Sequence, residues 1–166
     1  MRCYKAKLDA TAVAITIMVA VLVGISIATT CIAPPRRANS SVIKLLAMGL
    51  GFSALVVTYF FKPTAYFIED KKVHIKRPIG DIVIPLTDII ELKRIYKGDL
   101  GLGIRYFGSG GFFGYLGKYY YRSVGKVNIY STDCSKLVLI RAQKKYIISP
   151  DSPDEFINEL NSQLHR

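Results

Sequence analysis

The chain has 166 residues, a hydrophobic share of 51% and a formal net charge of +11, a length that allows one modest domain with or without an anchor. Its three cysteines are odd in number and widely spaced, and its two histidines have no Cys or carboxylate cluster beside them, so we expect no disulfide framework, no metal site and no cofactor. Residues 62–145 carry sixteen Lys and Arg against seven Asp and Glu, whereas residues 146–166 carry one against four. The basic surface is therefore expected on the middle of the chain.

Two uncharged apolar runs occupy the first third of the chain. Residues 10–33 form a run of 24 residues, which as a helix would be about 36 Å long, enough to cross a hydrocarbon core of about 30 Å. The run 45–61 is short for a span, but it extends to 42–61 if Lys44 snorkels its ammonium group to the headgroups. The sequence therefore predicts transmembrane helices over 10–33 and 42–61, joined by a loop over 34–41.

A secretory signal and a pore are the alternatives to a membrane anchor. Basic residues precede the first run, as in a signal peptide, but the run exceeds the usual 7–15 residue signal core and a second run follows it. Neither run contains a charged residue that could line a pore. Small residues in both runs predict close packing of the two helices, namely Gly24, Ser26, Gly49, Gly51 and Ser53.

The basic residues beside the runs predict the orientation. The flanks outside the hairpin carry eight Lys and Arg, and the intervening loop side carries three. By the positive-inside rule we expect a multi-pass protein of the inner (cytoplasmic) membrane with both termini in the cytoplasm, residues 1–9 forming the cytoplasmic N-terminus.

From Thr64 the hydrophobic periodicity drops toward two, which is typical of β-strands. The strongest signal is a hairpin with a turn at Asp70-Lys71-Lys72. The predicted strands are 65–69, 73–76, 81–86, 88–95, 126–132, 136–142 and 145–149.

The segment 98–122 is rich in glycine and aromatic residues, with eight glycines among the twenty residues 98–117. It lacks the last glycine of a dinucleotide fingerprint and the Lys-Ser/Thr of a phosphate loop, so nucleotide binding is rejected. Two interpretations stay open: an interfacial loop whose rings lie at headgroup level, or rings that close one end of a β core. The candidate interfacial residues are Phe112, Phe113, Tyr115, Leu116 and Tyr119.

The last predicted element is an amphipathic helix over 153–164. Ser152-Pro153-Asp154-Glu155 forms a capping-box sequence with proline at the first helical position. Phe156, Ile157, Leu160 and Leu164 then share one face, which should cover the sheet.

Several segments carry a family resemblance. They are Ile84-Pro85-Leu86-Thr87-Asp88-Ile89, Phe107-Gly108-Ser109-Gly110-Gly111-Phe112-Phe113-Gly114-Tyr115, Leu137-Val138-Leu139-Ile140, and Tyr146-Ile147-Ile148-Ser149-Pro150-Asp151 before Pro153-Asp154-Glu155-Phe156. Their order resembles the bacterial PH (pleckstrin-homology-like) domain proteins that carry paired transmembrane helices. The resemblance implies a PH-like barrel over 64–166, of about seven antiparallel strands closed by the C-terminal helix, with 98–122 as an insertion. It implies a membrane location and no catalysis. Eukaryotic relatives usually have a tryptophan in the closing helix, whereas this chain has none, which weighs against phosphoinositide recognition.

The resulting functional hypothesis is a protein- or lipid-binding or scaffold module on the cytoplasmic face of the membrane. Basic residues line the first hairpin, in the region where lipid-binding PH folds hold phosphates, and each contributes about 1 kcal/mol near an anionic surface. The partners considered are the bilayer, another protein and anionic lipid headgroups, and a homo-oligomer stays open. An accessory subunit of a membrane transport or envelope complex is the alternative. The candidate contact residues are Lys71, Lys72, His74, Lys76 and Arg77.

An enzyme of unknown type is the least favoured alternative. Catalysis needs a nucleophile with a base or paired carboxylates in a pocket. The acidic residues Asp81, Asp88, Glu91 and Asp99 are scattered among turns and strands, so we assign no catalytic residue. Basic residues among aromatics would also suit a nucleic acid, but the anchor and the balanced charge of the domain argue against that partner.

Overall fold

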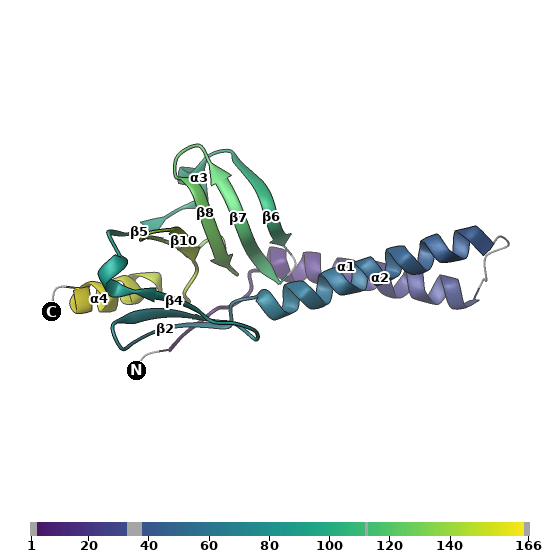
Figure 1. The fold of residues 1–166 in the computed structure, drawn as a ribbon, viewed down its shortest axis with the longest axis horizontal. Helices are drawn as coiled ribbons and strands as arrows, with labels where there is room; N and C mark the ends of the chain where they lie inside the picture. Colours follow the sequence, from purple (N-terminus) through teal and green to yellow (C-terminus); the bar gives the residue numbers. More distant parts are fainter. Residues whose placement is uncertain (1–2, 33–37, 112, 165–166) are drawn as a thin grey trace.

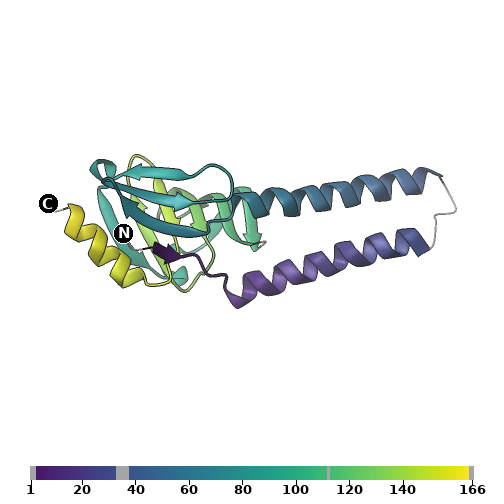
Figure 2. The same cartoon turned by 90° about the horizontal axis from the view of Figure 1, so that it is seen from below.

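The computed structural model describes residues 3–32, 38–111 and 113–164. Two long helices project from a β domain, and both chain ends lie at the domain (Figures 1 and 2). Helix α1 runs over Ala10–Ile32 and helix α2 over Ala38–Phe61. Residues 38–41 are therefore helical, not part of a loop as predicted, since no Gly or Pro interrupts the chain between Ala38 and Met48. The remainder of the predicted loop, 34–37, lies outside the described residues.

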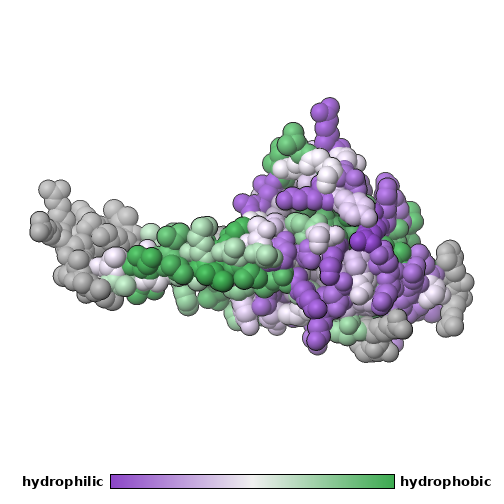
Figure 3. Space-filling view, turned by 180° about the vertical axis from the view of Figure 1, so that it is seen from behind, coloured by the Kyte–Doolittle hydropathy of each residue, from purple (hydrophilic) through white to green (hydrophobic). Residues whose placement is uncertain are grey.

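The helical hairpin is the apolar part of the molecule, whereas the domain surface is largely hydrophilic (Figure 3). Within the described residues, one segment is long and apolar enough to cross a membrane, Ala10–Thr29, and it is almost entirely exposed. The uninterrupted apolar part of α2, Leu46–Phe61, is shorter than a usual span. Length and composition thus identify one candidate span where the sequence predicted two.

The first sheet has four antiparallel strands in the order β1-β2-β3-β4. Their bounds are Cys3–Lys5, Ala65–Glu69, Lys72–Lys76 and Ile82–Pro85. Strand β1 precedes the helical hairpin and β2 follows it, yet Cys3 pairs with Phe67 and Lys5 with Ala65. Three residues are too few to show a strand periodicity, so β1 was not predicted.

The second sheet has six strands in the order β5-β9-β10-β8-β7-β6. Their bounds, in that order, are Glu91–Ile95, Leu137–Arg141, Lys145–Ile148, Gly125–Ser131, Gly114–Tyr121 and Gly103–Gly111. Strands β10 and β8 are parallel, and the other neighbours are antiparallel. No ladder joins the two sheets in the described part of the chain, so the predicted closed antiparallel barrel is wrong and the domain has mixed sheets.

Strands β6, β7 and β8 form a three-stranded extension of the second sheet, which we call the extension. It lies between β5 and β9 in the sequence and attaches through β8 to the edge of β10, in a parallel pair. Among themselves, the other seven strands pair only in the antiparallel direction. The segment 98–122 is consequently a short helix α3 (Lys97–Leu100) followed by the hairpin β6–β7. The predicted strand 88–95 begins at Glu91, because a 3-10 turn, η1 (Leu86–Asp88), redirects the chain and buries Leu86.

The main core lies between the first sheet, strands β9 and β10, and the C-terminal helix α4 (Pro153–Leu164). Phe156 and Leu160 of α4 are fully buried in it. In β9, Val138 and Ile140 join this core, whereas Leu137 and Leu139 join a second cluster on the other face of the sheet. Both faces of β9 are therefore buried, which explains its continuous apolar run.

Candidate functional site

The start of α1 is fixed to the domain by Asp9. Its Oδ1 accepts a hydrogen bond from the amide of Ala12 at 2.6 Å, which caps the helix. Its own N–H donates to the carbonyl of Thr132 at 2.9 Å, and its Oδ2 accepts from the amide of Cys134 at 3.4 Å. One side chain thus joins the first turn of α1 to the segment that follows β8.

The tip of the β6–β7 hairpin contacts both long helices at their domain ends. The amide of Phe113 donates to Thr16 Oγ1 of α1 at 3.1 Å. Its ring lies edge-on to Tyr59 of α2, with 5.5 Å between centroids, and the Lys62 ammonium lies 4.4 Å from the centre of the Tyr59 ring. Gly111 has a φ of +129°, and a Cβ there would lie 2.7 Å from Ile15 Cδ1. The tip therefore depends on glycine to approach α1 this closely.

Arg77 fixes the end of α2. Its guanidinium carbon lies 5.3 Å from the centre of the Phe61 ring and 5.6 Å from that of Tyr130, and its Nε donates to the carbonyl of Gly80 at 2.6 Å. Cation–π contacts with two rings hold this side chain between helix and sheet. We call the residues that make these contacts the collar: Asp9, Thr16, Tyr59, Phe61, Lys62, Arg77 and Phe113.

The five basic candidates of the first hairpin do not form one cluster. Lys71 and Lys72 lie at the β2–β3 turn, whereas α2 leads into the other end of β2. Because β2 has five residues, its two ends are about 17 Å apart. The carbonyl of Lys71 accepts from the amide of Leu86, whereas the β3–β4 connection reaches α2 through the amide of Ile79, which donates to the carbonyl of Phe60.

The rest of the basic set lies on the outer face of β3 or in the collar. The His74 ring stacks on Phe67, with 4.8 Å between centroids. Lys76 pairs with Ala65 beside the end of α2, and Arg77 belongs to the collar. Lys76 and Lys62 thus lie at the base of the helices, whereas Lys71 and Lys72 lie at the far end of β2.

The predicted interfacial residues are mostly not exposed. Leu116 is 4% exposed and Tyr119 is 9% exposed. Tyr115 lines a half-open cavity, and Phe113 belongs to the collar; Phe112 lies outside the described residues. Tyr115, Tyr119 and Tyr121 of β7 all line one cavity and so share a face of the sheet, whereas Tyr120 is exposed. The glycines scattered through this segment concealed that spacing in the sequence.

Exposed apolar side chains lie instead on and beside β6, the outermost strand on the side of the helical hairpin (Figure 1). Leu102 is 92% exposed, Ile104 71% and Phe107 70%. Within the described residues no strand pairs with the outer edge of β6. The sequence does not show which strands pair, and only the pairing reveals that β6 is an edge strand and which of its side chains share a face.

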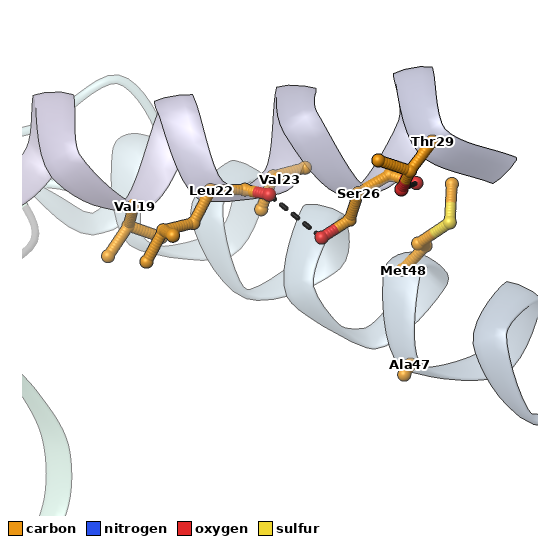
Figure 4. Close-up of a pocket in the computed structure, with 7 residues that line it drawn as sticks. All are labelled: Val19, Leu22, Val23, Ser26, Thr29, Ala47 and Met48. Atoms are coloured by element: carbon orange, nitrogen blue, oxygen red, sulfur yellow. Dashed lines mark hydrogen bonds between the residues drawn. The ribbon is translucent and has the colours of Figure 1, made fainter. Parts of the chain in front are cut away.

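The two long helices leave a gap of about 320 Å³ between them (Figure 4). Its lining residues are Val19, Leu22, Val23, Ser26, Thr29, Ala47 and Met48. The Ser26 hydroxyl donates within its own helix to the carbonyl of Leu22 at 2.8 Å. A Cβ on Gly24 or Gly49 would meet nothing within 4 Å, and one on Gly51 would lie 3.8 Å from Val23. The prediction that small residues bring the helices close is therefore wrong at Gly24 and Gly49.

No group of three or more His, Cys, Asp or Glu side chains in the described residues is placed to hold a metal ion. Cys3 and Cys134 are free thiols. Burial raises the pKa of the Cys134 thiol and that of the Tyr115 hydroxyl beside it.

These features define a β domain of two sheets with a C-terminal helix, joined at a collar to an apolar helical hairpin. The family model described as "Bacterial PH domain" matches residues 64–164, and the chain belongs to that family. No curated protein and no solved structure in the comparisons matches it significantly. The family match leaves out β1, although β1 is a strand of the first sheet.

Proposed function

We propose that this protein is an integral membrane binding and scaffold module. In this proposal α1 and α2 cross the inner membrane, and the PH-like domain on the cytoplasmic side binds a protein partner or anionic lipid headgroups without catalysing a reaction. The observation that carries the proposal is the pairing of β1 with β2 across the helical hairpin.

That pairing constrains the topology. A hydrogen-bonded sheet cannot be divided by a bilayer, so the residues before α1 and after α2 lie on one side of it. If α1 crosses, α2 must return, even though its uninterrupted apolar part is short. With 23 and 24 residues the helices are about 35 Å long, which matches the bilayer core.

The cytoplasmic orientation is tested with a reporter enzyme that folds only outside the cytoplasm. Fused after Arg166, it should stay inactive, and inserted between Arg36 and Arg37 it should be active. The reverse pattern would place the domain outside, and activity at neither position would remove the membrane crossing.

The outer edge of β6 is the surface that best suits a protein partner. Within the described residues it is a sheet edge to which no further strand is added, and exposed apolar side chains lie on and beside it, the two features that favour adding a strand from another chain. The photocrosslinking residue p-benzoylphenylalanine at position 104 should therefore form a specific adduct in cells. Ile90 is 79% exposed but lies outside the extension, so position 90 is the matched control. An adduct between two copies of the chain would indicate a homo-oligomer, and equal labelling from both positions would exclude β6 as the specific surface.

Headgroup binding is the second candidate, and the separation of the lysines makes it testable. In protein reconstituted in anionic bilayers, Lys62→Glu with Lys76→Glu should reduce the enrichment of anionic lipid around the protein. Lys71→Glu with Lys72→Glu should leave it unchanged, because the β2–β3 turn lies away from the helices. Equal effects of both pairs would show generic charge attraction instead of a site.

A further inference from the structure

A half-open cavity of about 380 Å³ lies on the face of the second sheet that bears the second apolar cluster. Leu100, Ile129, Leu137 and Ile147 line it, and each is at most 4% exposed. This volume is near the lower end of the range of about 300–1,000 Å³ for small-molecule sites. Its volume suits one short chain or ring.

Glycines of β6 make room for the polar wall of this cavity. A Cβ on Gly110 would lie 2.4 Å from Arg105 Nη1, and one on Gly103 would lie 2.2 Å from the Tyr121 ring. Arg105 pairs with Tyr119 across the hairpin. The absence of side chains at these glycines lets Arg105 and Tyr121 lie over the cavity.

The polar groups at this wall are cationic or hydroxylic. Arg105 and Lys97 both line the cavity, and the described lining contains no Asp or Glu. Within the described residues Arg105 forms no ion pair with a carboxylate, and its guanidinium interacts with Tyr119. The Tyr119 hydroxyl donates to the carbonyl of Ser109 at 2.9 Å. Asp9 lies near the Tyr115 and Cys134 end and is engaged in capping α1. The wall therefore suits an anion more than a cation.

We propose that this cavity binds a single-chain anionic amphiphile, with its head at Arg105 and Lys97 and its chain against the apolar floor. The charge of the wall selects the anionic head, since an arginine fork recognises carboxylate or phosphate in two-point contacts. The volume and the buried aliphatic floor select one short chain. This site depends neither on the side of the membrane that holds the domain nor on a protein partner at β6, so it can fail or succeed independently of the proposed function.

Cys134 reports on occupancy because it lines the cavity. We would use the full chain with Cys3→Ser and Cys31→Ser, in nanodiscs of zwitterionic lipid at pH 8.5, and measure alkylation of Cys134 by N-ethylmaleimide. Decanoate should slow alkylation saturably. Decanol should not, because it enters the bilayer equally well but has no charge, and acetate should not, because it has no chain. Arg105→Gln should raise the decanoate concentration needed for half protection about tenfold, because the substitution removes one hydrogen-bonded charge pair.

The matched control is Arg122→Gln, which removes an exposed arginine at the end of β7 that does not line the cavity. It should leave the protection by decanoate unchanged, and Arg105→Lys should retain part of it. Decyl phosphate in place of decanoate distinguishes the two head groups. Equal protection by decanol, equal protection in Arg105→Gln, or no protection by any anionic probe would each overturn the proposal.

Discussion

Replacing Tyr4 by alanine should strongly destabilise the domain, although Tyr4 lies outside the family match. The Tyr4 side chain is 4% exposed, and its ring meets Phe156 edge-on with 5.2 Å between centroids. Truncating a buried aromatic residue to alanine costs about 3–5 kcal/mol. The hydroxyl also donates to Glu159 Oε2 at 2.6 Å, so Tyr4→Phe should lose only about 1–2 kcal/mol of stability.

Pulse proteolysis of the full-length protein in nanodiscs over a urea series measures this loss. With a slope of about 1.5 kcal/mol per molar urea, the unfolding midpoint of Tyr4→Ala should fall by about 2–3 M. Tyr106→Ala is the control, since Tyr106 is 55% exposed on β6 and should change stability by less than about 0.5 kcal/mol. If Tyr4→Ala and Tyr106→Ala unfold at the same urea concentration, β1 does not belong to the sheet and the topological argument for two crossings is lost.

Three further changes test other contacts. Gly117→Ala should cost at least about 3 kcal/mol in the same assay, because φ is +124° and the new Cβ would lie 2.1 Å from a carbonyl oxygen of β6; Gly98→Ala, which meets nothing within 4 Å, should be neutral. Burial raises the pKa of Tyr66, so the neutral phenol stabilises the fold below about pH 10 and this contribution is lost as the pH rises further. Tyr66→Phe should therefore be less stable at neutral pH, and its stability should decline less at alkaline pH. Tyr59→Ala should speed amide exchange at residues 111 and 113–115 of the tip about fivefold by removing one aromatic contact, and unchanged exchange would show that the tip does not rest on α2.

Elements that depend on local periodicity could be predicted from the sequence. The C-terminal helix runs over the predicted residues 153–164, because its cap and its apolar spacing lie within one short segment. The β2–β3 hairpin was predicted for the same reason, since alternation and a turn specify it without distant partners. The apolar runs likewise identified the two long helices.

The candidate site was less predictable, because its contacts join residues far apart in the chain. A basic residue such as Arg77 looks available for a ligand in the sequence, and only its position between Phe61 and Tyr130 shows that it is engaged. Similarly, the rings of the segment 98–122 could be assigned to a face only after β6 and β7 were paired.

Composition and periodicity therefore established an apolar hairpin followed by a β-rich domain with a terminal helix. The three-dimensional fold established that β1 belongs to that domain, that β8 runs parallel to β10, and that Gly110 and Arg105 of β6 line a cavity. The physical reason is that strand pairing and side-chain burial are non-local: the pairing of Cys3 with Phe67, or the contact of the Phe113 ring with Tyr59 of α2, leaves no periodic trace in the sequence around either partner.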